Sequence, residues 1–221
     1  GAAYVFTRSG TSWSQQAILK ASNSDADDQL GNVVDIDGDT IVVWAEREAS
    51  NQTTITNGTG ASSDNSLANS GAVFVYTRSG TDWSQQAYIK PSNAAEYGGF
   101  GSSVSLQGDL LVVGTDEDSN ATTITNGSTA SSDTSSENSG AVYVFKRIGT
   151  SWSQIAYIKA VNADAQDSFG SGGSGVAIDN STIVVGSRGE ASNQLGITNG
   201  NTASSDNSNS SNGAVYVYRL Y

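Results

Sequence analysis

The side chains best suited to binding a metal ion are carboxylates and amides clustered in two polar loops. Calcium prefers several oxygen ligands at close spacing, so both loops are candidate calcium sites. The alternative is that these side chains accept hydrogen bonds from their own backbone in Asx turns. The candidate ligands are Asn23, Asp25, Asp27 and Asp28 in the first loop and Asn162, Asp164 and Asp167 in the second. No other cofactor is suggested by the sequence.

Catalytic chemistry has few residues to draw on. His and Cys are both absent, so the Ser-His-Asp and Cys-His arrangements and His-based zinc sites cannot be built. A pair of carboxylates could still hydrolyse a glycosidic bond. The acidic residues, however, are spread over polar loops, and no pair is defined by its spacing. We therefore expect a protein that is not an enzyme.

Asparagine side chains in the loops also offer attachment points for sugar. Sequons of the form Asn-x-Ser/Thr indicate surface loops that N-linked sugar can modify. A chain rich in Asn, Ser and Thr also forms sequons by chance, so glycosylation and plain surface polarity both remain open. The candidate sites are Asn51, Asn57, Asn120, Asn126, Asn180 and Asn209.

The overall charge excludes several kinds of partner. The 221-residue chain has a net charge of −12, which repels phosphate backbones and anionic lipid surfaces. No apolar run approaches the roughly 18 residues of a membrane span. We therefore expect neither nucleic-acid binding nor membrane insertion. The chain does not begin with Met, and we interpret it as a processed or excised piece of a longer product.

Three copies of one unit of about 70 residues occupy the chain. The units are residues 1–70, 71–139 and 140–212, followed by a terminal strand at 213–221, and together they form a single repeat domain. Each unit contains four runs rich in β-branched and aromatic residues, which predict four antiparallel strands. In the second run, simple alternation predicts that Trp83, Gln85, Ala87 and Ile89 share one face. Long polar tracts at 46–70 and 116–139 predict loops that are either functional or tolerated insertions.

Tryptophan recurs at one place in each unit, as Trp13, Trp83 and Trp152. Such residues could stack on sugar rings, but the regular position favours packing between repeats. Trp44 occurs in only one copy, and it either fills a gap or lies at an interface.

The motif residues resemble the FG-GAP repeat, the repeat of integrin α-chain propellers and of many bacterial surface proteins. The resemblance lies in Phe100-Gly101-Ser102-Ser103-Val104, then Leu111-Val112-Val113-Gly114, then Gly140-Ala141-Val142-Tyr143-Val144-Phe145. It implies β-propeller-like blades of four antiparallel strands, each blade starting at the third strand of a unit. It also implies an extracellular or cell-surface location. The family's calcium-binding turn is approached only at residues 35–39, and we do not expect calcium there.

Counting strands in this register reveals a surplus. The chain begins with strands three and four of a blade, continues with two whole blades, and ends with strands one to three of another. The surplus strand is residues 2–7 or its near-copy 214–219. Three blades are too few to close a ring, and an unpaired strand is a template for pairing with another chain. The predicted inter-chain residues are Ala2, Tyr4, Phe6, Val215 and Val217.

Three arrangements remain open: a fragment of a longer propeller, a six-bladed ring of two chains, or a head-to-tail fibre. The sequence favours a non-enzymatic, extracellular structural or adhesive protein that self-associates by strand pairing, as a subunit of a glycosylated fibre. The alternative is an integrin-like binding module that holds a protein or glycan ligand, with or without calcium.

Overall fold

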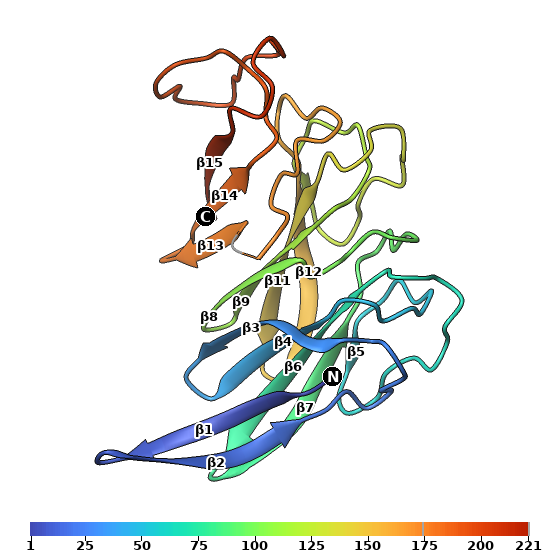
Figure 1. The fold of residues 1–221 in the computed structure, drawn as a ribbon, viewed down its shortest axis with the longest axis vertical. Helices are drawn as coiled ribbons and strands as arrows, with labels where there is room; N and C mark the ends of the chain where they lie inside the picture. The colour runs from blue at the N-terminus through green and yellow to red at the C-terminus, as the bar shows by residue number, and fades with distance from the viewer. Residues whose placement is uncertain (174, 221) are drawn as a thin grey trace.

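The computed structural model describes residues 1–173 and 175–220, and its four antiparallel sheets follow one another along the long axis (Figure 1). We number these sheets blade 1 to blade 4 from the N-terminus. Over the described residues, no helix is long and apolar enough to cross a membrane.

Blades 1 and 2 occupy the N-terminal half of the chain. Blade 1 is a hairpin of β1 (Ala3–Ser9) and β2 (Ser12–Leu19). Blade 2 has the strand order β3-β4-β6-β7-β5. Its strands are β3 (Leu30–Asp37), β4 (Thr40–Ala45), β5 (Thr56–Asn57), β6 (Ala72–Ser79) and β7 (Asp82–Ile89).

Blades 3 and 4 repeat this plan until the chain ends. Blade 3 has the order β8-β9-β11-β12-β10, and blade 4 has β13-β14-β15. The strands are β8 (Ser103–Gln107), β9 (Leu110–Thr115), β10 (Thr125–Asn126), β11 (Ala141–Ile148), β12 (Ser151–Ile158), β13 (Val176–Asp179), β14 (Thr182–Ser187) and β15 (Ala214–Arg219). The all-β, propeller-like fold is confirmed, and each complete blade starts at the third strand of a repeat unit.

The long polar tracts contain structure that their composition did not predict. Each folds back so that two residues pair with the fourth strand of its own blade. In blade 2, Thr56 pairs with Tyr88 and Asn57 with Ala87, and β10 repeats this in blade 3. The complete blades therefore have five strands rather than four. The signal was missed because two residues are too short for any periodicity to appear.

The predicted face of Trp83 is wrong. Val75 pairs with Ala87 but Tyr76 pairs with Gln85, so Gln86 is an extra residue in a β-bulge. A bulge shifts the alternation by one residue, because two residues on one strand oppose one on the other. Trp83 therefore packs with the cluster that contains Tyr88 and faces blade 1, while Ala87 and Ile89 face blade 3.

The hydrophobic core lies between successive blades. Apolar residues of one blade's second and third strands, such as Val42 and Val75, pack against the next blade's first strands, such as Val104 and Leu111. Blades 1 and 4 lie at opposite ends of the array (Figure 1), so the described residues do not close into a ring.

Candidate assembly interface

A buried polar network holds the long loop of blade 2 against its fourth strand. Lys90 donates to Glu48 Oε2 at 2.9 Å, to Ser70 Oγ at 2.6 Å and to the Gly71 carbonyl at 2.7 Å. Tyr88 donates to the other oxygen of the Glu48 carboxylate at 2.8 Å. Glu48 and Lys90 are almost fully buried, and burial lowers the pKa of Lys90. The desolvated charges thus depend on each other and on neutral donors and acceptors.

Blade 3 repeats the same network. Lys159 donates to Glu117 Oε2 at 3.2 Å and to the Gly140 carbonyl at 2.6 Å, while Tyr157 donates to Glu117 Oε1 at 3.0 Å. Burial raises the pKa of Glu117 and lowers that of Lys159. Our sequence reasoning missed this network. Its signal was available, because Glu48, Glu117 and Glu190, and likewise Lys20, Lys90 and Lys159, recur in successive copies.

Tryptophan residues join neighbouring blades. Trp83 Nε1 donates to Gln16 Oε1 of blade 1 at 2.8 Å, and Trp152 Nε1 donates to Gln86 Oε1 of blade 2 at 2.9 Å. The Arg147 guanidinium lies over the Trp152 ring at 5.1 Å. Trp13, on the first blade that the structure describes, is exposed. At positions 83 and 152 these side chains serve packing between blades.

Two further features join blades 2 and 3. Asp35 Oδ2 accepts from the Leu106 N–H at 2.7 Å, and Asp37 Oδ2 accepts from the Gly108 N–H at 2.6 Å. The acidic turn at residues 35–39 is therefore used as a connector between blades. Trp44 is buried against Gly101, where an added Cβ would overlap its ring, so this tryptophan lies at a blade interface.

The candidate calcium ligands of the first loop have other partners. Asp28 Oδ2 accepts from the Asp25 N–H at 2.8 Å, and Asp25 Oδ2 accepts from the Asn65 amide at 2.8 Å. Asn23 donates to Glu48 Oε1 at 3.1 Å. Asp27 is exposed with a positive φ of 67°. This is the geometry of an Asx turn in which the oxygens do not converge.

The second loop is built in the same way. Asp167 Oδ2 accepts from the Asp164 N–H at 2.9 Å, Asp164 Oδ2 accepts from the Asn207 amide at 2.9 Å, and Asn162 donates to Glu190 Oε1 at 3.1 Å. Across residues 1–173 and 175–220, no three acidic side chains gather as metal ligands. Calcium binding stays a prediction, which calorimetric titration with calcium and a chelator tests.

The environment of the Asn23 side chain indicates a substitution that should stabilise the protein. Its equivalents Asn93 and Asn162 accept hydrogen bonds from Tyr143 and Tyr216, but blade 2 has Phe74 at that place. The buried Asn23 Oδ1 is consequently without a partner in the described structure. We expect Phe74→Tyr to stabilise the chain by about 1 kcal/mol, because it supplies the missing donor. Urea unfolding measures this. Unchanged or lower stability would contradict the assignment.

Asp167 makes stability depend on pH. Burial raises its pKa to about 6, so the native state holds the proton more tightly than the unfolded chain. Its stabilising contribution is present below the unfolded pKa of 3.8 and is lost as pH rises through about 6. We expect Asp167→Asn to remove this loss and to stabilise the protein at pH 7 by about 1–2 kcal/mol.

The measurement is the free energy of unfolding of both proteins from pH 4 to 7. Asp27→Asn, at an exposed position of the equivalent loop, is the control and should follow the wild type. Parallel curves for Asp167→Asn and wild type would contradict the prediction.

All six sequon asparagines are exposed, but they differ in what they contact. Asn57 accepts from the Trp152 N–H at 2.7 Å and donates to its carbonyl at 3.4 Å, so its amide joins two blades. Asn51 and Asn120 begin equivalent stretches of the two long loops, ahead of the short strands β5 and β10.

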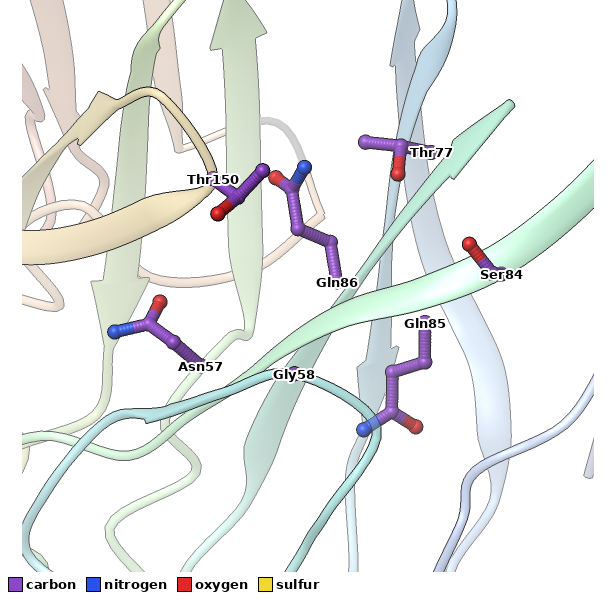
Figure 2. A pocket seen from close by; sticks show the side chains of 7 residues that line it. All are labelled: Asn57, Gly58, Thr77, Ser84, Gln85, Gln86 and Thr150. Carbon is purple, nitrogen blue, oxygen red and sulfur yellow. The ribbon is translucent and has the colours of Figure 1, made fainter. Parts of the chain in front are cut away.

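A shallow polar hollow of about 340 Å³ lies beside Asn57, where blades 2 and 3 meet. Figure 2 shows Gln86 reaching toward Thr150 of blade 3 while Gln85 points away, toward the long loop. Gln86 Oε1 already accepts from Trp152, and the lining is neutral amides and hydroxyls. The hollow is a seam between blades with groups that suit a hydroxyl-rich ligand.

The predicted inter-chain strands lie at the two ends of the array. Ala2 is half-buried beside Gly31, whereas Tyr4 and Phe6 on β1 are exposed. Val215 and Val217 on β15 are exposed as well. Over residues 1–173 and 175–220, β1 pairs only with β2 and β15 only with β14, so each leaves one edge open there.

An open array of antiparallel blades, in which blades 2 and 3 have five strands each, with buried seams between blades defines a propeller-type repeat protein. The FG-GAP repeat family matches residues 13–76 and 83–145, which is more than half of the chain. The chain belongs to the FG-GAP repeat family. No curated protein matches it.

Proposed function

We propose that the chain is a non-enzymatic, extracellular structural or adhesive protein whose blades join between chains by strand pairing to build a fibre. The observation that carries this is that the two outer blades of the described residues are unequal: blade 1 has two strands there and blade 4 has three. Each end leaves a strand edge open, and open edges are templates for pairing. A contact between unlike ends repeats indefinitely unless its rotation closes.

Imaging and mass measurement of the purified chain test this proposal. We expect light scattering to report mass that grows with protein concentration, and negative-stain images to show long polymers. A particle of twice the chain mass would indicate a two-chain ring instead of a fibre. Monomers at every concentration would overturn assembly by strand pairing.

A second candidate function is a binding module for a glycan or protein ligand. The hollow beside Asn57 favours it, since its amides and hydroxyls match sugar hydroxyls. Binding of soluble oligosaccharides by monomers, weakened by Thr150→Val, would favour this candidate over the fibre.

We also propose that the fibre is glycosylated in its long loops. Asn51 and Asn120 are the better-placed sequons, because the Asn57 amide is engaged by Trp152. Intact mass of the protein from its natural source should exceed the bare chain by sugar units. A mass equal to that of the bare chain would remove the claim.

A further inference from the structure

Within the described residues, blade 4 has the long loop of a complete blade but no fourth strand for that loop to pair with. In blades 2 and 3 the short strands β5 and β10 pair with β7 and β12. The equivalent segment at residues 198–199 forms no strand in the described structure, and its neighbours Leu195 and Ile197 are almost wholly exposed. The missing element is therefore a strand of the β7 and β12 type.

Without this fourth strand, a buried carboxylate of blade 4 also has no cation beside it in the described part of the chain. Glu190 is buried like Glu48 and Glu117, yet the bonds recorded to its carboxylate come from Asn162 Nδ2 at 3.1 Å, the Ser192 N–H at 3.3 Å and Ser192 Oγ at 3.2 Å. Within residues 1–173 and 175–220 it has no salt bridge. A buried carboxylate without a cation is costly, which makes this position a receptor for a positive charge.

The matching lysine is at the other end of the molecule. Lys20 follows β2, as Lys90 follows β7 and Lys159 follows β12. It is exposed and donates to the Gly1 carbonyl at 2.6 Å, the same bond that Lys90 makes to Gly71 and Lys159 to Gly140. Lys20 thus makes one of the three hydrogen bonds that its equivalents make, and it lacks the bonds to the carboxylate and to the serine.

The apolar faces at the two ends are complementary too. Val215 and Val217 are 68% and 66% exposed. At the other end, Val34 and Ile36 are 54% and 58% exposed. Their equivalents at the internal seams, Val142, Val144, Val104 and Leu106, are all buried. The two ends are therefore the two halves of one more blade seam.

Two glycines of blade 4 mark where the next blade would lie. An added Cβ at Gly140 would overlap the Phe169 backbone, and one at Gly114 would overlap the Gly170 carbonyl of the next blade. At the equivalent Gly213 and Gly186, the nearest atoms would be 3.6 Å and 3.9 Å away and belong to blade 4 itself. The outer face of blade 4 therefore has the glycines of a blade seam but not, among the described residues, the neighbouring blade that they contact at an internal seam.

We propose that the occupant is a second copy of this chain, whose β2 becomes the fourth strand of blade 4 and whose Lys20 bonds Glu190. This rests on the proposed assembly by strand pairing and names its joint. At this joint, β15 of the first copy takes the place of β1 of the second copy beside β2. Strand β1 has the same sequence pattern as β15, and within the described residues it pairs with β2 alone. Strand β15 keeps its place, because six of its residues pair with β14 and Tyr216 packs on Phe169 at 5.2 Å.

The register of the joint follows from blade 3. There Val144 pairs with Ala156 and Tyr143 with Tyr157. By repeat equivalence, Val217 of one copy faces Ala17 of the next, and Tyr216 faces Ile18. The chain contains no Cys, so paired cysteines report this contact directly.

The first test is a chain that carries Val217→Cys and Ala17→Cys. We expect oxidation to convert the polymers into a ladder of covalent multimers on a denaturing gel. A control with Val217→Cys and Ile18→Cys should cross-link poorly, because neighbouring residues of a strand point to opposite faces. Polymers without a ladder would overturn this joint but leave strand-paired assembly standing. The absence of polymers would overturn both.

The second test addresses the ion pair by a double-mutant cycle on self-association. We expect Lys20→Met to weaken association about 100-fold, since it leaves Glu190 buried alone. Glu190→Gln should weaken it less. The association constant of the double variant should be at least about 10-fold higher than the two single effects multiplied together would predict.

Lys146→Met, which removes an exposed lysine, is the matched control and should associate like the wild type. Additive single effects, or no effect of Lys20→Met, would overturn the Lys20–Glu190 contact.

Discussion

Lys90→Met is expected to destabilise the isolated chain by about 3–5 kcal/mol. The thioether keeps the length of the side chain but removes the donor to Glu48, Ser70 and the Gly71 carbonyl. Glu48 then stays buried with a charge that no cation balances, and this cost dominates the lost hydrogen bonds. Urea unfolding of dilute protein, below the concentration at which chains associate, measures the change.

The repeat supplies a matched control for this substitution. Lys20→Met changes the same residue type at the same place in the unit, but Lys20 is exposed and its one recorded hydrogen bond is to Gly1. We expect a change within about 0.5 kcal/mol in the isolated chain. Equal effects of the two substitutions would show that the buried network does not contribute as described.

Gly114→Ala is expected to destabilise by about 3 kcal/mol. The added Cβ would lie inside contact distance of the Gly170 carbonyl oxygen and carbon and of Ser103 Oγ. The Gly170 oxygen belongs to the backbone of the next blade, so relief requires blades 3 and 4 to move apart. Overpacking of a close seam typically costs about 1–3 kcal/mol, and a backbone clash lies at the upper end.

Gly186→Ala is the control for this second prediction. Gly186 is the equivalent residue of blade 4, and the nearest atom to an added Cβ is the Gly175 oxygen at 3.9 Å. In the isolated chain we expect no loss and a gain of up to about 1 kcal/mol, since alanine restricts the unfolded state. A loss at Gly186 equal to that at Gly114 would contradict the account of the seam.

The strands and their grouping into blades were predictable because their signal is local. Runs such as Ala141–Ile148 combine β-branched and aromatic residues, and they recur in every unit with turn residues between them. The FG-GAP-like motifs then place the start of each blade. The bulge at Gln86 was not predictable, because an extra residue in a strand becomes visible only when its partner is known.

The candidate ligands show the limit of composition. Asp25, Asp28, Asp164 and Asp167 are close in sequence, yet their oxygens are turned to the backbone and to Asn amides. The spacing of these residues shows that their oxygens are close along the sequence, but the direction in which each oxygen points depends on the loop conformation. The two-residue strand β5 was invisible for a related reason, since its pairing is decided by β7.

By itself, the sequence determined the repeat, the four strands of each unit and a strand count that leaves the ends unequal. Only the tertiary structure decided which residues those ends expose. Glu48 and Lys90 are 42 residues apart and meet because a long loop folds back onto a fourth strand. The chain brings such a loop and strand together twice, in blades 2 and 3. The remaining pair does not meet: Glu190 follows β14 of blade 4 and Lys20 follows β2 of blade 1. Within the described residues, blade 4 has no strand of the β7 type and blade 1 has no long loop.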